Sequence, residues 1–333
     1  MTSLIVDYSE VDNSLSSKIA PIAQEESSPL DMEQGTISIV TPNSVTENAN
    51  GKTKATITLP SAARISNAAR IKAPRLKSLL QDECSAWELT KSGLAELIGT
   101  AMLVFLGCMG CVGSLGNQPA LLQVSFVFGF AVMLIIQSIG HISGGHINPA
   151  ITIGAVVMGK KSLMAASVYI FAQCLGGVLG YGLLKVITPQ ALLFGNDGPS
   201  TTSSFCITDL HVDISIIQGL LGEIIATAIL MFMTCAVWDV RNEKNTDSVA
   251  IKFGLTISVL CLAIGPYTGC SLNPARSLAP AIWNNYWSHH WIYWFGPIGG
   301  SLLASVAYLS IFSPKKCSLT ECSPLSENTQ AHI

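Results

Sequence analysis

Charged side chains are scarce in this sequence. Asp, Glu, Lys and Arg make up 12% of the 333 residues, whereas ordinary soluble domains carry about 25%. Hydrophobic residues make up 49%. This composition excludes a typical soluble domain and indicates a membrane protein. The sequence also lacks a basic face of the kind that binds nucleic acid, so we expect no nucleic-acid partner.

Patterns typical of catalysis or metal binding are lacking as well. No nucleophile and base pair stands out, so we expect neither an enzyme nor a cofactor. Cys108 and Cys111 have Cys-x-x-Cys spacing, but no second pair or histidine follows at the distance of a metal ligand. Of the ten cysteines, only Cys206 falls in a long polar loop. We therefore expect no metal site and no disulfide framework, and interpret the cysteines as small buried apolar side chains.

The N-terminal part of the chain differs in composition from the rest. Residues 1–90 are rich in Ser, Thr, Asn and Ala and show little hydrophobic periodicity. Such a segment buries too little apolar surface to offset the entropy lost on ordering. We predict a disordered N-terminal tail over residues 1–90, a membrane domain over residues 91–313 and a short C-terminal tail over residues 314–333.

Long apolar runs follow the tail, each about 20 residues, the length that crosses a bilayer as a helix. There are six, near residues 93–115, 121–140, 163–187, 214–238, 250–265 and 291–312. Two shorter apolar stretches, near residues 148–158 and 273–283, each follow a glycine-containing turn. They are too short to cross and indicate re-entrant half-helices. The sequence therefore predicts an all-α membrane protein with six transmembrane helices and two half-helices.

Basic residues beside these runs predict the orientation of the chain. They lie before the first run, between the second and third, between the fourth and fifth, and after the sixth. These segments share one side of the membrane, which the positive-inside rule makes cytoplasmic. The loops on the other side contain Asp197, Asp209 and Asp213 and almost no Lys or Arg. We expect a multi-pass protein of the cell membrane with both termini in the cytoplasm.

The two halves of the membrane domain resemble each other. Two segments recur in the same order: Ala95–Ala101 matches Gly222–Ala228, and Gly144–Ala150 matches Gly269–Ala275. Repeat one covers about residues 91–187 and repeat two about residues 214–313. Each repeat has an odd number of spans, so the second inserts upside down relative to the first. An inverted repeat places a site at the bilayer midplane, where irregular backbone is tolerated if it lines a water-filled cavity. The topology thus predicts a pore.

Each half-helix opens with the sequence Asn-Pro-Ala, at Asn148-Pro149-Ala150 and at Asn273-Pro274-Ala275. Asn is a favoured cap and Pro is favoured at the first helical position, so one copy would indicate only a helix start. Two copies in matching positions of a repeat are much more specific. They predict two positive helix ends that meet at the membrane centre, where the Asn amides donate to a passing water and the helix dipoles repel cations.

Three charged residues lie in the apolar segments. Arg276 directly follows the second Asn-Pro-Ala sequence. Charge at membrane depth is costly and usually functional, and a guanidinium supplies fixed donors to a solute while it repels cations. Glu96 and Glu223 occupy matching positions of the repeat. We interpret them as acceptors for the backbone of the re-entrant loops, with ion coordination as the alternative.

Residues 92–312 resemble the aquaporin or major intrinsic protein family, with His141–Ala150 and Tyr267–Ser277 similar to its two signature loops. The resemblance implies an aquaporin-like right-handed helix bundle and a homotetramer with one pore per subunit. It implies passive passage of water and small neutral solutes through a lipid bilayer. It also implies a constriction on the outer side of the Asn pair at four matching positions, namely Phe128, Cys261, Cys270 and Arg276.

Cys261 departs from the pattern of the water-selective members, which usually have His at this position. A thiol there is expected to leave a wider and less polar ring. The usual glycerol-conducting branch does not fit either, because it typically has Asp where Ser277 stands. A water-type framework without the His is similar to the insect entomoglyceroporins, which implies passage of glycerol and urea as well as water. The alternatives are a strictly water-selective channel and a structural or junctional protein of the same fold.

His141 and His146 lie in the first signature loop, near the expected cytoplasmic vestibule. We interpret them as neutral hydrogen-bonding anchors, with pH sensing as the alternative. A coupled transporter is a further alternative for the whole chain. It would need intramembrane carboxylates arranged as an ion site, and only Glu96 and Glu223 are available.

Overall fold

The computed structural model describes residues 3–7, 44–47, 53–58, 85–112, 119–189, 192 and 205–313. The chain divides into two units, Met1–Arg70 and Ile71–Ile333. The predicted C-terminal tail over residues 314–333 lies outside the described residues.

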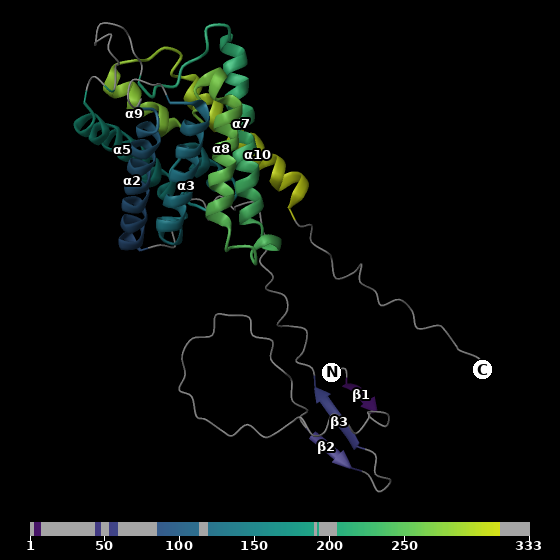
Figure 1. The fold of residues 1–333 in the computed structure, drawn as a ribbon. Helices are drawn as coiled ribbons and strands as arrows, with labels where there is room; N and C mark the ends of the chain where they lie inside the picture. Colours follow the sequence, from purple (N-terminus) through teal and green to yellow (C-terminus); the bar gives the residue numbers. More distant parts are fainter. Residues whose placement is uncertain are drawn as a thin grey trace. The chain divides into compact units, whose positions relative to one another are not determined.

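The described part of the first unit is a three-stranded antiparallel sheet with the order β1-β3-β2 (Figure 1). Its strands are β1 (Ser3–Asp7), β2 (Ser44–Glu47) and β3 (Thr53–Thr58). Thr, Val and Ile favour extended backbone, which accounts for these short strands. Composition alone predicts no regular structure here, because the polar residues around the strands outweigh the strands themselves. The disordered tail remains a prediction for the other residues up to 84, which lie outside the described ranges.

The second unit is a helix bundle (Figure 1). In its described part, six helices are long and apolar enough to cross a membrane: α2 (Ala86–Met109), α3 (Leu121–Ser143), α5 (Leu163–Ile187), α7 (Ile216–Trp238), α8 (Val249–Thr268) and α10 (Ile292–Ala307) with the π-turn η4 (Tyr308–Phe312). The short helices are α4 (Pro149–Val157), α9 (Pro274–Asn284) and the single turn η3 (Val240–Asn242). The predicted all-α membrane fold with six spans and two half-helices is confirmed.

The first span lies earlier in the sequence than expected. Helix α2 begins at Ala86 and ends at Met109, whereas hydropathy placed the span near residues 93–115. Ser85 caps the helix because its side chain accepts a hydrogen bond from the backbone N–H of Glu88 at 3.2 Å. The first turns carry polar residues that hydropathy does not count as membrane, although they continue the same helix.

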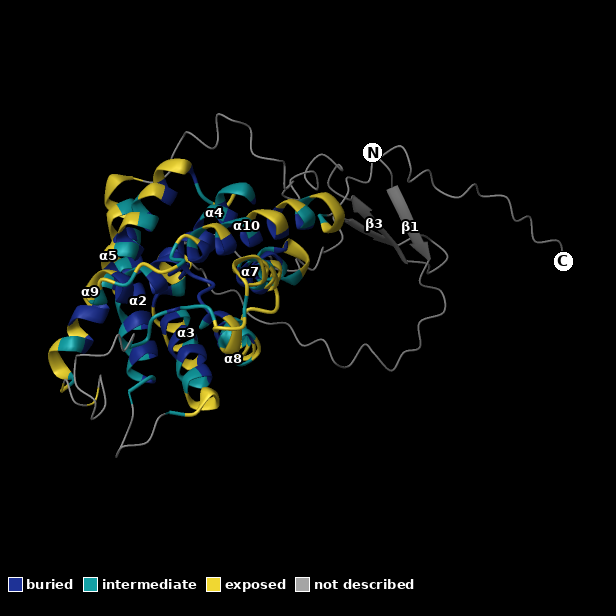
Figure 2. Ribbon diagram, turned by 90° about the horizontal axis from the view of Figure 1, so that it is seen from above, coloured by how far each residue is buried: buried dark blue, intermediate teal, exposed yellow. Residues whose placement is uncertain are grey.

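The two repeats pack their helices in the same way. Helix α2 packs along α5, α7 packs along α10, and α3 packs along α8. A Cβ at Gly176 of α5 would lie 2.2 Å from the carbonyl oxygen of Leu97, and a Cβ at Gly300 of α10 would lie 2.2 Å from that of Ile224. Small residues thus allow close backbone approach at equivalent places of both repeats. The buried helix faces point inward and the exposed faces outward (Figure 2).

Candidate channel and its constriction

Helices α4 and α9 begin at matching asparagines. Asn148 Oδ1 accepts from the backbone N–H of Ala150 at 2.8 Å, and Asn273 Oδ1 accepts from that of Ala275 at 3.0 Å. A proline follows each asparagine at the start of the helix, where its missing N–H leaves no unpaired partner. Both helices therefore direct their positive ends at the asparagine pair.

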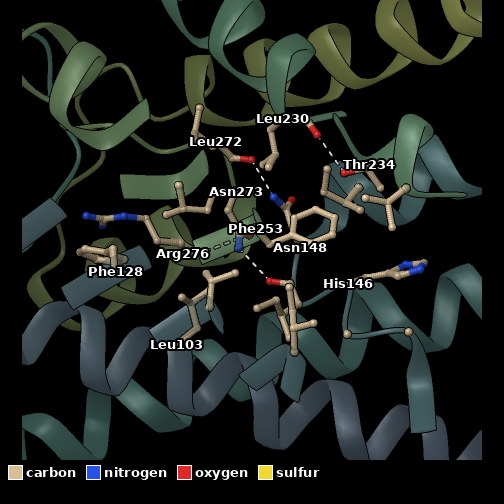
Figure 3. A pocket seen from close by; sticks show the side chains of 18 of the residues that line it. Leu103, Phe128, His146, Asn148, Leu230, Thr234, Phe253, Leu272, Asn273 and Arg276 are labelled. Carbon is tan, nitrogen blue, oxygen red and sulfur yellow. Dashed lines mark hydrogen bonds between the residues drawn. The ribbon is translucent and has the colours of Figure 1, made fainter. Parts of the chain in front are cut away.

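The two asparagine amides join the re-entrant loops reciprocally. Asn148 Nδ2 donates to the carbonyl of Leu272 at 2.7 Å, and Asn273 Nδ2 donates to the carbonyl of Ile147 at 2.8 Å (Figure 3). Each amide nitrogen carries two hydrogens, so one of them is left for a molecule in the cavity that both asparagines line. The half-helices meet end to end as the repeat predicts.

Buried Glu96 fixes the shape of the first loop. Its two carboxylate oxygens accept from Ser143 Oγ at 2.6 Å, the backbone N–H of His146 at 2.9 Å, the backbone N–H of Ile147 at 2.6 Å and Gln173 Nε2 at 2.8 Å. Ile147 has φ 45°, which is unusual for a β-branched residue. The hydrogen bond from its N–H to the carboxylate helps to hold this strained backbone.

Glu223 repeats this arrangement in the second loop. It accepts from Thr268 Oγ1 at 2.6 Å, the backbone N–H of Ser271 at 2.9 Å and the backbone N–H of Leu272 at 2.8 Å. Leu272 has φ 54°, so the two loops share the same left-handed turn before the asparagine. The carboxylates are occupied by loop donors, which supports the structural role expected of both glutamates.

A cavity of about 120 Å³ is lined in part by the two asparagines. The asparagines lie between His146 on one side and Phe128 with Arg276 on the other (Figure 3). Most of the wall is apolar and comes from α2, α3, α4, α7 and α8: Leu103, Val132, Ile136, Ile151, Leu230, Phe253 and Ile257. Polar groups come mainly from the two loops and from the start of α9, so a solute meets hydrogen-bond partners beside a largely apolar wall.

Arg276 is held from two directions at one end of the cavity. Its Nη1 donates to the carbonyl of Cys206 at 2.8 Å, and its guanidinium carbon lies 4.9 Å from the ring centroid of Phe128. The second contact has the geometry of a cation–π interaction. Gly107 makes room for the ring, because a Cβ there would lie 2.2 Å from it.

The two constriction cysteines are in contact. Cys261 projects from α8 and Cys270 from the second loop, with their sulfur atoms 3.5 Å apart. Both residues line the cavity together with Phe128 and Arg276. The structure thus brings together all four residues that the sequence assigned to the constriction.

The two histidines of the first loop have different surroundings. His146 lines the cavity, its Nδ1 lies 3.1 Å from Thr152 Oγ1, and its ring packs edge-on against Tyr169. His141 is exposed in the last turn of α3 and does not line the cavity. Only His146 therefore has the contacts expected of a vestibule anchor. Within the described residues, no group of three His, Cys, Asp or Glu side chains could hold a metal ion.

A disulfide joins Cys108 at the end of α2 to Cys206, with Cα atoms 5.5 Å apart. The expectation that these two cysteines are free apolar side chains is wrong. They are 98 residues apart in sequence, so only the folded chain brings them together. The position of Cys206 in a polar loop was the available sign of a disulfide in the sequence, but it did not indicate which cysteine pairs with it.

Cys206 is also a site residue, which no sequence pattern marks. Its carbonyl holds Arg276, yet a backbone acceptor leaves no mark on the side-chain pattern of a sequence. The same segment is fixed further along, because Thr208 Oγ1 donates to Ser277 Oγ at 2.8 Å.

In the described part of the chain, six helices can span a membrane, two half-helices meet at the asparagines that cap them, and a cavity is lined by both asparagines. These features define a multi-pass membrane channel. A family model described as "Major intrinsic protein" matches residues 83–308. The chain belongs to the major intrinsic protein family, that is, to the aquaporins and their relatives. Members of this family are passive channels for water and small solutes, not enzymes.

Named relatives agree with this assignment. Aquaporin-4 of Mus musculus is 37% identical over 228 residues, covering 67% of this chain and 68% of the relative. Aquaporin-2 of Bos taurus is 35% identical over 240 residues, covering 71% of this chain and 85% of the relative. The crystal structure of the aquaglyceroporin from Plasmodium falciparum matches with a TM-score of 0.56 and 25% identity, covering 67% of this chain and 96% of that structure.

Proposed function

We propose that this channel passes water, glycerol and urea and excludes protons and ions. The contact between Cys261 and Cys270 beside Arg276 carries the proposal. A ring of one aromatic, one guanidinium and two thiols has a polar side and an apolar side. A polyol or urea keeps hydrogen bonds to Arg276 and to nearby carbonyls while its less polar parts lie against Phe128 and the thiols, which lowers the cost of leaving water.

The same geometry supports the exclusion of ions. The positive ends of α4 and α9 face the middle of the cavity. Arg276 forms no salt bridge with any described residue, and the carboxylate of Glu223, which interacts with it at longer range, is bonded to the second loop. A cation therefore meets three positive centres and few ligands to replace its water shell. A water held by the free hydrogens of Asn148 and Asn273 accepts from both, which interrupts a chain of donors for proton hopping.

We further propose that the Arg276 end of the pore faces the extracellular side of the cell membrane, with both termini cytoplasmic. The basic residues flanking the spans support this orientation. The Cys108–Cys206 disulfide supports it independently, because disulfides persist in oxidising compartments. The channel domain would then begin with α2 at Ala86, earlier than the predicted boundary at residue 91, and run to residue 313, with cytoplasmic tails before it and over residues 314–333. By family resemblance the subunits form a homotetramer, which native mass spectrometry of the detergent-solubilised protein would test.

Stopped-flow swelling of proteoliposomes tests the solute range. The full-length protein is reconstituted at known density, and water, glycerol and urea fluxes are measured separately against empty liposomes. We expect all three fluxes to exceed the lipid background, with no proton flux under an imposed pH gradient. Passage of water alone would show a strictly water-selective channel. Negligible flux of every solute would favour the structural or junctional alternative.

A further inference from the structure

Three sulfur atoms gather at the end of α2. Cys108 and Cys206 form the disulfide, and the sulfur of Cys111 lies 3.7 Å from that of Cys206. Cys111 is a free, partly buried thiol. The Cys-x-x-Cys spacing, with Cys108 in the last turn of α2 and Cys111 just after it, thus places two possible partners beside one loop cysteine.

This sulfur cluster is joined directly to the constriction. The carbonyl of Cys206 accepts from Arg276 Nη1 at 2.8 Å. The residue that carries the disulfide is therefore the residue that fixes one side of the guanidinium, and the ring of Phe128 lies against it from another direction. A change in the bonding of Cys206 changes the restraint on Arg276.

The backbone at Cys206 depends on its cross-link more than its neighbours do. Cys206 has φ 57°, a left-handed conformation that is unfavourable for a side chain with a Cβ. The carbonyl of Phe205 accepts from Tyr181 Oη at 2.8 Å, and Thr208 is bonded to Ser277. These hydrogen bonds do not involve the disulfide, so we expect them to hold the neighbouring residues when it opens and to confine any displacement to Cys206 and its carbonyl.

We propose that Cys108, Cys111 and Cys206 form a thiol–disulfide exchange site that positions Arg276 and thereby sets the solute range of the pore. The disulfide on Cys206 keeps its carbonyl on the guanidinium and the constriction narrow. Reduction frees the side chain of Cys206, so that its carbonyl no longer holds the guanidinium of Arg276 in place and the constriction widens. The solute-range part of this inference rests on the proposed function.

The chemistry needs no group beyond thiols. In the exchange, the thiolate of Cys111 attacks the sulfur of Cys206, the bond from Cys206 to Cys108 breaks, and Cys108 leaves as a thiolate that takes up the proton lost by Cys111. Full opening by dithiothreitol gives two cysteine thiols and one cyclic disulfide of the reagent, so the electrons and protons balance. Either pairing of Cys206 leaves its carbonyl tethered, whereas full reduction does not.

The test compares redox states and serine variants of the full-length protein in proteoliposomes. We expect dithiothreitol to raise the urea-to-water and glycerol-to-water permeability ratios of the wild type at least two-fold, and oxidised glutathione to restore them. Cys108→Ser should form a Cys111–Cys206 disulfide under oxidised glutathione, identified by mass spectrometry of alkylated peptides, and keep the oxidised ratios. Cys108→Ser/Cys111→Ser should show the reduced ratios in both reagents. Cys174→Ser, which changes a free cysteine on α5, should behave as the wild type.

Two results would overturn the inference. The first is an unchanged permeability for water, urea and glycerol, each measured alone, in wild-type protein that alkylation shows to be reduced. The second is the absence of any Cys111–Cys206 product in Cys108→Ser. If the oxidised wild type passes only water, the proposed solute range is wrong. The exchange site is then tested by whether the water permeability changes when the disulfide is reduced.

Discussion

The guanidinium carbon of Arg276 lies 4.9 Å from the ring centroid of Phe128, and this contact closes one side of the pore. Arg276 belongs to α9 in the second repeat and Phe128 to α3 in the first. In the proposed constriction, selectivity would therefore depend on a contact between the two halves. The opposite side of the ring is formed by the thiols of Cys261 and Cys270, which are much smaller than the imidazole of water-type channels.

Restoring an imidazole should narrow this ring. We expect Cys261→His to abolish glycerol and urea flux and to spare most of the water flux, because the larger ring fills the space beside Cys270 and adds polar contacts. Paired swelling assays at matched protein density measure this. Cys174→Ser on α5 is the control for loss of a cysteine. Intact glycerol flux in Cys261→His would mean that another residue sets the width.

Mercurial reagents should block the pore at Cys270. The thiol lines the cavity beside Cys261, so mercury bound there stands in the path of a solute. We expect Cys270→Ser to lose most of the inhibition of water flux by mercuric chloride, and Cys261→Ser to lose a smaller part. Full block of the double variant would place the reactive thiol elsewhere, and Cys111 would be the next to replace.

The second loop should depend on the carboxylate of Glu223. In Glu223→Gln, an amide N–H group faces the loop donors, and at least one hydrogen bond from the backbone of Ser271 or Leu272 is lost. Loss of a buried hydrogen bond to a charged group costs about 1.5–3 kcal/mol. We expect a lower melting temperature in detergent and a reduced water flux per molecule. Glu243→Gln changes an exposed residue and should leave both the melting temperature and the water flux unchanged. If Glu223→Gln behaves in the same way as this control, the carboxylate of Glu223 does not hold the second loop.

The acid stability of the loop after α7 should depend on Asp239. Arg241 donates to both of its carboxylate oxygens, at 2.8 and 2.6 Å, and Tyr308 Oη donates at 2.9 Å. These bonds, chiefly those from Arg241, hold the pKa of Asp239 well below its ordinary value of 3.8. Because the pKa of Asp239 is lower in the folded than in the unfolded protein, its ionised form stabilises the fold at pH values above the ordinary pKa. This stabilisation is lost as the pH falls from the ordinary pKa through the pKa of the folded state.

Melting temperatures of Asp239→Asn and wild type in detergent test this pair. We expect the variant to melt lower at pH 7 and the difference to shrink as the pH is lowered below about 4. Asp247→Asn, on the same connection but exposed, serves as the control. A difference that stays constant down to pH 2 would show that Asp239 acts through packing and not through its charge.

The sequence alone determined the membrane fold, its inverted repeat and the positions that line the pore. Hydropathy records each span locally, and the duplicated Asn-Pro-Ala motif marks both half-helices, so the meeting of Asn148 and Asn273 followed from topology. The sequence also named Arg276, Phe128, Cys261 and Cys270 through resemblance, and these four line one cavity.

Only the tertiary structure decided what holds Arg276. Cys206 lies in a polar segment without hydrophobic periodicity, so no sequence pattern records that it pairs with Cys108, 98 residues earlier. The bond from Arg276 ends on a backbone carbonyl, which every residue carries and no side-chain pattern marks. The reciprocal bonds of the asparagines to Ile147 and Leu272 were hidden for the same reason. Side-chain spacing could place the constriction, whereas backbone acceptors reached through loops required the folded chain.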